Sequence, residues 1–322
     1  MPAVSLIVPV YKVEPYIGRC ARSLFGQTMA DLEYIFIDDC TPDRSIDILK
    51  EVLEEFPERK AQVKIHRMPR NSGQAEVRKT GISLAGGDYI AHCDSDDTLA
   101  PEACEKLYRK ALAEQLDIVT CDFLMGDDRT GWKRKSLKSA PGRAVSDLLS
   151  GRVMGSLGPR LIRRELLAGA KAPVANFCED LVLVVSATLK ATAVGHLPEA
   201  LHNYYIREES ISHRPGKAAL LARLEDLKAN AGPILEALRE DGRFPEKGAD
   251  VVFFKYRCRQ DLQPFVHQKD IFNVWKNVFP EINRIFLFTR GISAEQKFFF
   301  ILIYLHLFRP WKKVMGKLRH RV

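Results

Sequence analysis

Three carboxylates follow a short apolar segment in the first third of the chain, where Asp94-Ser95-Asp96-Asp97 comes directly after residues 89–93. The apolar run predicts a buried strand, and acids placed so closely at its end repel one another unless a counter-charge lies nearby. Mg²⁺ or Mn²⁺ would supply that charge, because hard divalent cations prefer oxygen ligands. Since Mg²⁺ takes one or two protein carboxylates and leaves its other positions to water and phosphate, the pattern indicates half of a metal site. A diphosphate-bearing substrate would complete it.

An acidic loop that caps the next helix is the alternative, because Asp is common at helix starts. Two other predicted strand ends bear on the choice. Residues 5–10 end near Pro9, which cannot donate to a strand ladder, and residues 33–37 end in Asp38-Asp39. The chain contains no glycine pattern of the dinucleotide-binding or P-loop type, so a metal ion remains the expected phosphate partner.

Strands and helices alternate over the first 121 residues. Apolar runs predict five strands, at residues 5–10, 33–37, 63–66, 89–93 and 117–121. Amphipathic stretches predict the helices between and after them, at residues 15–25, 45–56, 71–85 and 101–114. This order predicts an α/β fold, a doubly wound and mostly parallel sheet with helices on both faces. Such sheets bind ligands beyond the carboxyl ends of their strands, where all three chemically marked segments fall, and this favours the metal site.

The composition describes a globular chain with room for one large domain or two ordinary ones, with 322 residues, 46% hydrophobic and 28% charged. Its seven cysteines form no CxxC pair and mostly lie in apolar strings, which indicates reduced core thiols in a cytoplasmic protein. The first apolar run lacks a basic leader and is too short to span a bilayer, so no secretory signal is expected. The net charge of +8 suggests anionic partners, and nucleic acid is not expected among them.

A second acid pair, Glu179-Asp180, opens the apolar segment 181–185. The helix dipole favours acids at a helix start, and Asn176 is a candidate cap, so a structural role in the first turn is one interpretation. A catalytic role is the other, and the pattern alone leaves both open. Between the first strands and this pair, the polar and turn-rich residues 126–142 are expected to form a loop.

The last third of the chain is expected to be helical, with an amphipathic helix at residues 217–238 and further helices within 251–285. An apolar run at 298–308 is too short to cross a bilayer. Trp311 and a set of basic residues follow without an acid: Arg309, Lys312, Lys313, Lys317, Arg319 and Arg321. This composition is typical of a segment lying in an anionic membrane interface, and a core helix followed by a solvated basic tail is the alternative.

Taken together, these residues resemble the inverting, GT-A-fold glycosyltransferases of family 2. Residues 5–11 are similar to that family's opening strand, and Ile37–Ser45 to its DDGSTDxS stretch. Asn71-Ser72-Gly73 and Arg78 resemble the segment before its DxD motif, which Asp94-Ser95-Asp96 matches. These pieces occur in the family's order over residues 4–104. Cys40-Thr41-Pro42 departs from the family's GST, and Lys12 stands where Asn is common, which leaves the preference for a nucleotide base unspecified.

The resemblance implies a role for each matched position. The nucleotide-sugar would contact residues at the strand ends and near them: Pro9, Tyr11, Glu14, Asp38, Asp39, Arg78, Asp94 and Ser95. Asp96, with Asp94, would bind the metal, which leaves Asp97 as the acid best suited to a structural role. Asp180 of the family's ED pair would be the catalytic base, with Glu179 beside it. The acceptor side would include the segment that resembles YxYR…SxS, with Tyr205, Arg207 and Ser210.

The implied reaction is a single in-line displacement that moves a sugar from a nucleotide-sugar, usually a UDP-sugar, to an acceptor with inversion. Mn²⁺ or Mg²⁺ would be the cofactor. Relatives of this size often build bacterial surface polysaccharides, so a saccharide or lipid-linked acceptor is expected. Residues 1–213 would form the catalytic GT-A domain. Residues 214–322 would form a helical region whose tail, 296–322, touches the inner face of the plasma membrane.

Three alternatives stay open at this point. Asp94–Thr98 also matches the DxDxT pattern of haloacid-dehalogenase phosphatases, although that motif usually follows a first strand. A sugar-phosphate nucleotidyltransferase would share the architecture, but residues 11–14 lack the glycine- and basic-rich loop it needs. A catalytically silent, membrane-associated protein that only binds nucleotide-sugars is the third.

Overall fold

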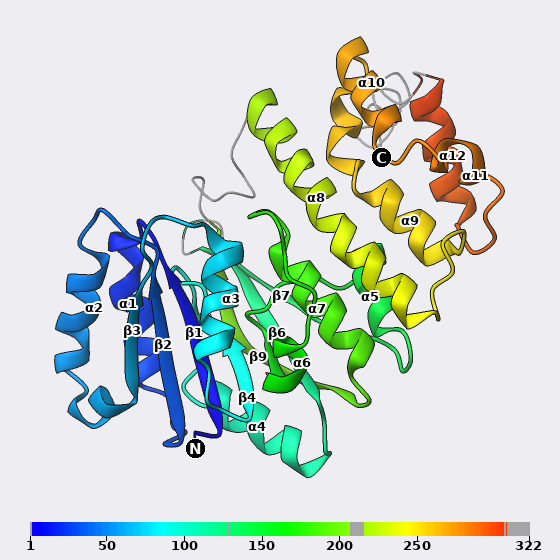
Figure 1. The fold of residues 1–322 in the computed structure, drawn as a ribbon. Helices are drawn as coiled ribbons and strands as arrows, with labels where there is room; N and C mark the ends of the chain where they lie inside the picture. The colour runs from blue at the N-terminus through cyan, green and yellow to red at the C-terminus, as the bar shows by residue number, and fades with distance from the viewer. Residues whose placement is uncertain (1, 128, 130, 207–215, 306, 308–322) are drawn as a thin grey trace.

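A nine-stranded sheet forms the core of the N-terminal half in the computed structural model, which describes residues 2–127, 129, 131–206, 216–305 and 307 (Figure 1). Its strands are β1 (Val4–Val10), β2 (Leu32–Asp38), β3 (Val63–Arg67), β4 (Tyr89–His92), β5 (Thr98–Leu99), β6 (Ile118–Asp127), β7 (Gly131–Lys135), β8 (Arg160–Arg163) and β9 (Val194–Tyr205). Their order across the sheet is β3-β2-β1-β4-β8-β6-β9-β5, with β7 paired to β6.

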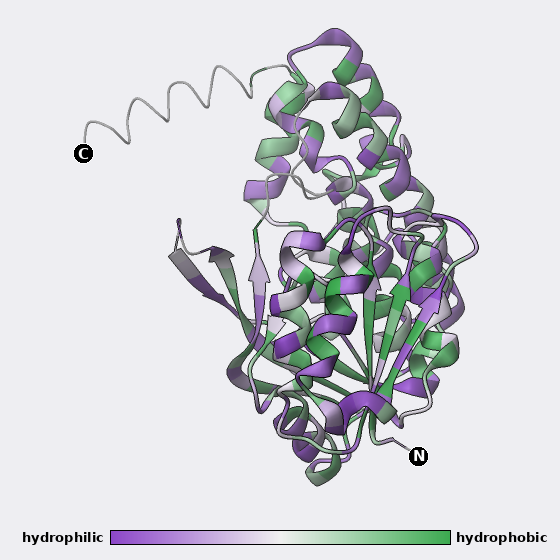
Figure 2. Ribbon diagram, turned by 90° about the vertical axis from the view of Figure 1, so that its left-hand side faces the viewer, coloured by the Kyte–Doolittle hydropathy of each residue, from purple (hydrophilic) through white to green (hydrophobic). Residues whose placement is uncertain are grey.

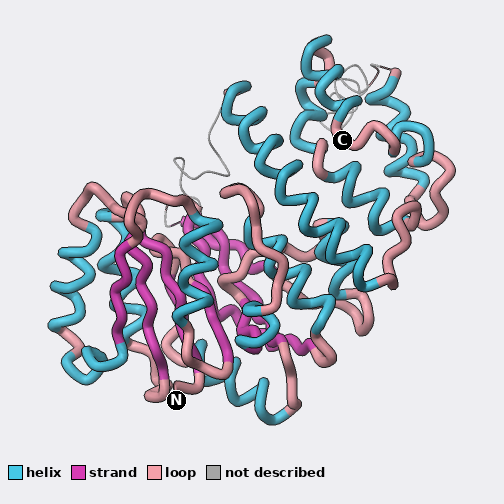
Figure 3. The backbone as a smooth tube through the Cα atoms, viewed as in Figure 1, coloured by secondary structure: helices cyan, strands magenta, loops and turns pink. Residues whose placement is uncertain are grey.

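The helices fall into two groups, those that cover the sheet and those that form the C-terminal region (Figure 3). The first group is α1 (Glu14–Phe25), α2 (Ser45–Glu54), α3 (Gln74–Leu84), α4 (Ala103–Ala113), α5 (Ala144–Ser150), α6 (Arg164–Ala168) and α7 (Glu179–Lys190). The second is α8 (Lys217–Asp241), α9 (Ala249–Arg257), α10 (Lys269–Asn277), α11 (Ile282–Ile285) and α12 (Ala294–Tyr304). The strands and helices predicted for the first 121 residues are confirmed, with ends that differ by a few residues.

Strands β1 to β4 are mutually parallel, so their carboxyl ends lie at one edge of the sheet. Val4 is in register with both Leu32 and Tyr89, and Val10 is in register with Asp38. Alternate residues of β1 enter different cores, because successive side chains of a strand point to opposite faces. Helices therefore cover both faces, as predicted, and the loops beyond β1, β2 and β4 meet at the same edge.

The other half of the sheet is mixed. Strand β8 runs antiparallel to β4 and β6, whereas β9 is parallel to β6 with register shifts around Asp122. The prediction of a loop is confirmed for residues 136–142 but is wrong before them, because β6 continues to Asp127 and pairs with β7 in a hairpin that projects from the body (Figure 2). Most of β7 is exposed and basic, so it lacks the apolar alternation by which a strand is recognised in sequence.

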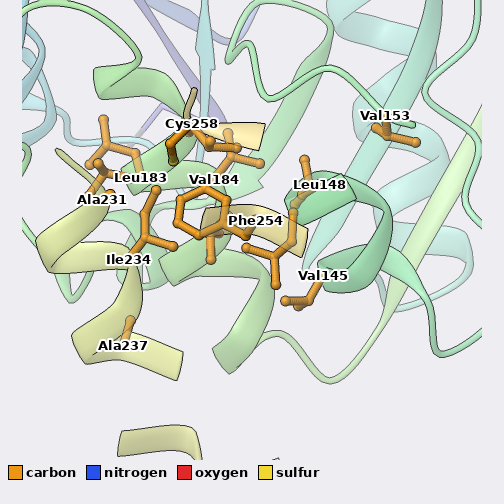
Figure 4. Close-up of a cluster of buried hydrophobic side chains, with 14 of the residues drawn as sticks. Val145, Leu148, Val153, Leu183, Val184, Ala231, Ile234, Ala237, Phe254 and Cys258 are labelled. Atoms are coloured by element: carbon orange, nitrogen blue, oxygen red, sulfur yellow. The ribbon is translucent and has the colours of Figure 1, made fainter. Parts of the chain in front are cut away.

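The C-terminal helices pack directly onto the helix that begins with the second acid pair. Leu183 and Val184 of α7 lie against Ala231 and Ile234 of α8 and Phe254 of α9 (Figure 4). Leu148 of α5 lies in the same buried cluster. The amphipathic helix predicted at 217–238 is confirmed as α8. This shared core fixes α7 between the sheet and the helical region.

Helix α12 is partly a core element. Phe300 is buried against Phe286, with ring centroids 4.7 Å apart, and against Trp275 at 5.7 Å. Phe298 and Ile301 remain 45% and 39% exposed. No helix among the described residues is both long and apolar enough to cross a bilayer. The basic segment 309–321 lies outside the described residues.

Gly81→Ala should lower the free energy of unfolding by about 1–3 kcal/mol, because overfilling a packed contact forces the backbone to move. A Cβ atom at Gly81 would lie 2.5 Å from Cγ2 of Ile7, so α3 would have to shift away from β1. Gly18→Ala in α1 is the matched control, since its added Cβ would lie at ordinary van der Waals distance, 3.4 Å from Cγ2 of Ile48. We expect that variant to be unchanged or stabilised by up to about 1 kcal/mol in chemical denaturation. Equal losses in the two variants would contradict the packing argument.

Candidate active site

The acids that follow β2 organise the loops at the carboxyl edge. The Asp39 carboxylate accepts hydrogen bonds from the amides of Ser72 (2.6 Å) and Gly73 (2.9 Å), which begin the approach to α3. Asp38 accepts from the Thr41 amide at 2.8 Å and forms an ion pair with Arg67 at 3.2 Å. Both carboxylates are buried, so they hold the loops around the mouth of the site in place.

The end of β1 contributes the other predicted nucleotide contacts. Pro9 is buried in register with Ile37, and Tyr11 is 40% exposed just beyond the strand. Glu14 is the first residue of α1, and its carboxylate accepts from the Arg44 amide at 3.1 Å. These side chains lie at the same edge as the acids of β2.

Arg78 of α3 is the centre of the site. Its Nη2 donates to Oδ1 of Asp94 at 3.0 Å, and its Nε donates to Oε1 of Glu179 at 3.0 Å. The same Nε lies 2.8 Å from Oδ1 of Asp180. The Arg78 side chain is only 2% exposed. A single buried guanidinium therefore joins the loop after β4 to the start of α7, with three carboxylates around one cation.

Burial and the neighbouring charges change the pKa values of Glu179 and Asp180. Burial and the neighbouring Asp180 raise the pKa of Glu179 to about 8, against the lowering effect of Arg78. Burial also raises the pKa of Asp180, with Arg78 lowering it and Asp94 raising it. Asp180 is the more accessible of the two, with its side chain 18% exposed against 6% for Glu179. Its Oδ2 accepts from the Leu157 amide at 3.1 Å.

The predicted cap of α7 is wrong. The N-cap position is Cys178, with φ of 62° and no side-chain cap bond, and Asn176 lies two residues earlier. Asn176 instead accepts from the Ala75 amide at 3.2 Å, at the start of α3. Gly73 makes this approach possible, because its φ is +82° and a Cβ there would lie 2.4 Å from the Asn176 amide. The segment before α7 is therefore held by a contact made across the site.

The acids of the loop after β4 lie in different surroundings. The Asp94 side chain is 35% exposed beside Arg78, whereas Ser95 is buried. Asp97 is buried, lies 2.9 Å from Nε2 of His202, and accepts from the Tyr205 amide at 2.9 Å. The alternative of an acidic cap does not hold, because α4 begins at Ala103 with Glu102 as its N-cap and no side-chain cap bond.

The loop after β4 could supply only part of the predicted metal site. Among the described residues, no group of three or more His, Cys, Asp or Glu side chains could hold a metal ion. Asp94 and Asp96 would supply two carboxylates at most, which suits an ion that takes its remaining ligands from water and substrate phosphate.

Several residues at the site had no signal in the sequence. The buried Arg160 lies near Asp180, and burial lowers the pKa of Arg160 to about 10 while the Asp180 charge raises it. His92 of β4 is buried, and burial and the Arg78 charge hold its pKa well below the usual value. Arg19 of α1 donates from Nη2 to the Asp96 carbonyl oxygen at 2.8 Å. Each lies at an ordinary helix or strand position. Folding brings Arg160 and Arg19 to the site, whereas His92 lies two residues before Asp94.

The acceptor segment is described only in part. Tyr205 ends β9, and its ring packs edge-on against Trp132 of β7 with centroids 4.7 Å apart. Arg207 and Ser210 lie outside the described residues.

A model of a known family matches this chain over residues 5–168, and its description is glycosyl transferase family 2. The chain belongs to that family. Glycosyltransferase EpsJ of Bacillus subtilis is 33% identical over 236 residues, which cover 70% of this chain and 67% of EpsJ. This membership decides against the phosphatase and nucleotidyltransferase alternatives, and the chain is a glycosyltransferase.

Solved structures share the fold of this glycosyltransferase. Residues 1–349 of S. aureus TarS in complex with UDP-GlcNAc match with a TM-score of 0.61 and 16% identity, over 99% of this chain and 92% of that one. Mannosyltransferase PcManGT from Pyrobaculum calidifontis, in complex with GDP-Man and Mn²⁺, matches with a TM-score of 0.51 and 14% identity, over 95% and 87% of the two chains. The predicted fold class is confirmed.

Glu179→Gln should reduce the pH dependence of stability in this glycosyltransferase. Between pH 5 and 8, the free energy of unfolding should fall less in the variant than in the unaltered chain. A folded-state pKa of about 8, above the unfolded value of about 4.3, means that the folded chain binds the extra proton between these pH values. Glu179 therefore lowers the free energy of unfolding as the pH rises from about 5 to about 8, and Gln cannot titrate. Denaturant unfolding at the two pH values measures the difference.

Glu33→Gln is the matched control. Burial raises the pKa of Glu33, but hydrogen bonds from Lys64, the Gly86 amide and Ser5 outweigh it and hold the pKa below its usual range. The stabilisation from Glu33 is lost only as the pH falls, so its removal should leave the difference between pH 5 and 8 unchanged. If Glu179→Gln kept the pH dependence of the unaltered chain, the raised pKa would be wrong.

Proposed function

We propose that this glycosyltransferase moves a sugar, with inversion, from a UDP-sugar to a saccharide or lipid-linked acceptor in bacterial surface-polysaccharide synthesis, with Mn²⁺ or Mg²⁺. The observation that carries the proposal is the cluster of Asp94, Glu179 and Asp180 around Arg78 at the carboxyl edge of the sheet. The structural relatives add support, because one was solved with UDP-GlcNAc and another with GDP-Man and Mn²⁺.

Asp180 is the proposed catalytic base. It is more exposed than Glu179, and burial raises its pKa above the usual carboxyl value, which makes it a stronger base. In the displacement, the acceptor oxygen bonds to the anomeric carbon, the bond from that carbon to the diphosphate oxygen breaks, and Asp180 takes the hydroxyl proton. Inversion follows from one displacement. The Arg78 charge opposes the effect of burial on the pKa of Asp180, and it therefore favours the ionised form that accepts the proton.

The donor would lie along the strand ends. Asp96, with Asp94, would hold the metal ion, which when bound neutralises charge on the leaving diphosphate. The proposed nucleotide contacts are the residues at the ends of β1, β2 and β4 and their neighbours: Pro9, Tyr11, Glu14, Asp38, Asp39, Arg78, Asp94 and Ser95. Buried Asp38 and Asp39 act there by fixing the loops through backbone amides.

Asp96→Ala and Asp180→Asn should each abolish sugar transfer, but only Asp96→Ala should weaken binding of the UDP-sugar in Mn²⁺. The reason is that Asp96 acts on the donor through the metal, whereas loss of a general base removes about 10²–10⁴-fold in rate without a donor contact. Calorimetric titration with the donor and a transfer assay measure the two effects.

Asp88→Asn, exposed at the amino end of β4, is the control for a lost carboxylate and should change neither quantity. Equal losses of donor affinity at Asp96 and Asp180 would refute the division of roles. The donor itself is found by a hydrolysis screen of UDP-, GDP- and dTDP-sugars with Mn²⁺, and absence of hydrolysis or binding for all three classes would refute the proposed function.

We also propose that residues 296–322 hold the enzyme at the cytoplasmic face of an anionic membrane, near a lipid-linked acceptor. Phe298, Ile301 and Leu305 follow a helical spacing, and they are 45%, 39% and 59% exposed. Phe288 is 83% exposed, and it lies two residues after Phe286, which packs against Phe300 of α12. The sequence continues into the basic segment 309–321, and exposed apolar residues beside basic charge favour an anionic lipid surface.

Phe298→Glu combined with Ile301→Glu should reduce binding to phosphatidylglycerol vesicles by roughly tenfold or more, because two apolar side chains no longer enter the interface. Vesicle co-sedimentation measures this, with phosphatidylcholine vesicles as the uncharged comparison. Leu112→Glu, at a residue 56% exposed on α4, is the matched control. These substitutions test the exposed side chains alone. Deletion of residues 296–322 would also remove the buried Phe300 and so disturb the core. Equal binding by the double variant and the unaltered chain would refute the proposal.

A further inference from the structure

Arg19 joins two segments of the site that lie far apart in the sequence. From α1, its Nη2 donates to the carbonyl oxygen of Asp96 at 2.8 Å. Its guanidinium carbon lies 3.5 Å from the centroid of the Tyr205 ring, at the end of β9. The Tyr16 ring lies on the same guanidinium at 5.6 Å. Arg19 therefore contacts the backbone of the proposed metal ligand and the aromatic ring of the acceptor-side segment at once.

Tyr205 is tied to the same loop by its backbone. The Tyr205 amide donates to Oδ1 of Asp97 at 2.9 Å, and His202, three residues earlier in β9, lies 2.9 Å from Oδ2 of Asp97. The Trp132 ring packs edge-on against the Tyr205 ring, with centroids 4.7 Å apart. A main-chain and a side-chain contact from β9 thus converge on Asp97, the residue next to Asp96.

The Arg19 contacts depend on the shape of a guanidinium. A planar cation close to an aromatic ring gains cation–π attraction, about 0.5–1 kcal/mol at exposed sites and more when desolvated. The Nε atom of Arg19 is buried and meets no acceptor among the described residues. The contacts that stabilise the Arg19 side chain are therefore the Tyr205 ring and the Asp96 carbonyl oxygen. A lysine would keep the charge but lose the planar stack.

We infer that Arg19 is a positioning residue for the donor site, which fixes the backbone of Asp96 against Tyr205 so that the Asp96 carboxylate is held ready for the metal-bound diphosphate. This inference rests on the proposed role of Asp96. It assigns to α1 and β9 a part in donor binding, in addition to the acceptor-side position of Tyr205. Residues that orient a metal ligand from behind typically account for about 10–100-fold in metal affinity or activity.

The test measures binding of UDP by calorimetry, in Mn²⁺ and in EDTA, for the full chain and its variants. Arg19→Ala should weaken binding in Mn²⁺ by about 10–100-fold and leave the weak binding in EDTA unchanged. Arg19→Lys should show an intermediate loss, and Tyr205→Leu, which removes the stacked ring, should resemble Arg19→Ala. The double variant should be no weaker than either single variant, because both changes break the same unit.

Arg22→Ala is the matched control, three residues further along α1, where the side chain is 55% exposed and paired with Glu55. It should leave binding in Mn²⁺ unchanged. Thermal unfolding of every variant separates loss of fold from loss of position, and Arg19→Lys provides the test if Arg19→Ala does not fold.

Two results would overturn the inference in distinguishable ways. If the unaltered chain binds UDP equally in Mn²⁺ and EDTA, the metal role in the proposed function fails, and the inference fails with it. If the unaltered chain depends on Mn²⁺ but folded Arg19 variants retain its affinity, the proposed function stands and only the role of Arg19 is refuted. Equal losses in Mn²⁺ and EDTA by folded variants would also refute the role of Arg19, because the effect on UDP binding would then not pass through the metal.

Discussion

The buried guanidinium of Arg78 is the interaction on which the site depends. It connects Asp94, after a central strand, with Glu179 and Asp180, at the start of a helix more than 80 residues later. One cation cannot neutralise three carboxylates, and burial makes the excess negative charge more costly. Burial and the Asp180 charge raise the pKa of Glu179 to about 8, against the lowering effect of Arg78. A divalent cation bound with the donor diphosphate would add positive charge at the same point.

Packing behind the site keeps this charged cluster in place. Strands β1 to β4 bring the loops to one edge because they are parallel, and Gly81 lets α3 approach β1 closely enough to carry Arg78 there. On the other side, α7 is held between the sheet and the C-terminal helices through Leu183 and Ile234. The helical region therefore supports the start of α7, which carries Glu179 and Asp180.

The sequence predicts many of the strands and helices correctly, because their local patterns agree with how they pack in the fold. The apolar runs of β1, β2 and β4 are buried on both faces, and the buried leucines and isoleucine of α8 recur at helical spacing. Strand β7 was missed because an exposed basic hairpin carries little hydrophobic alternation. Asn176 was assigned to the wrong helix because its partner, the Ala75 amide, lies 101 residues away. The sequence shows that Asn176 is of a type that caps helices. It does not show which helix start lies near it in the folded chain.

The sequence by itself determined the family, the strand ends that carry acids, and the pair Glu179-Asp180, because motif spacing along the chain is local information. Only the tertiary structure decided how these groups share charge. It placed Arg78 against both acid segments, separated the buried Asp97 from Asp94 through His202, and brought Arg19 onto Tyr205. The physical reason is that pKa values and ion pairs depend on distance and burial, which only the folded chain sets.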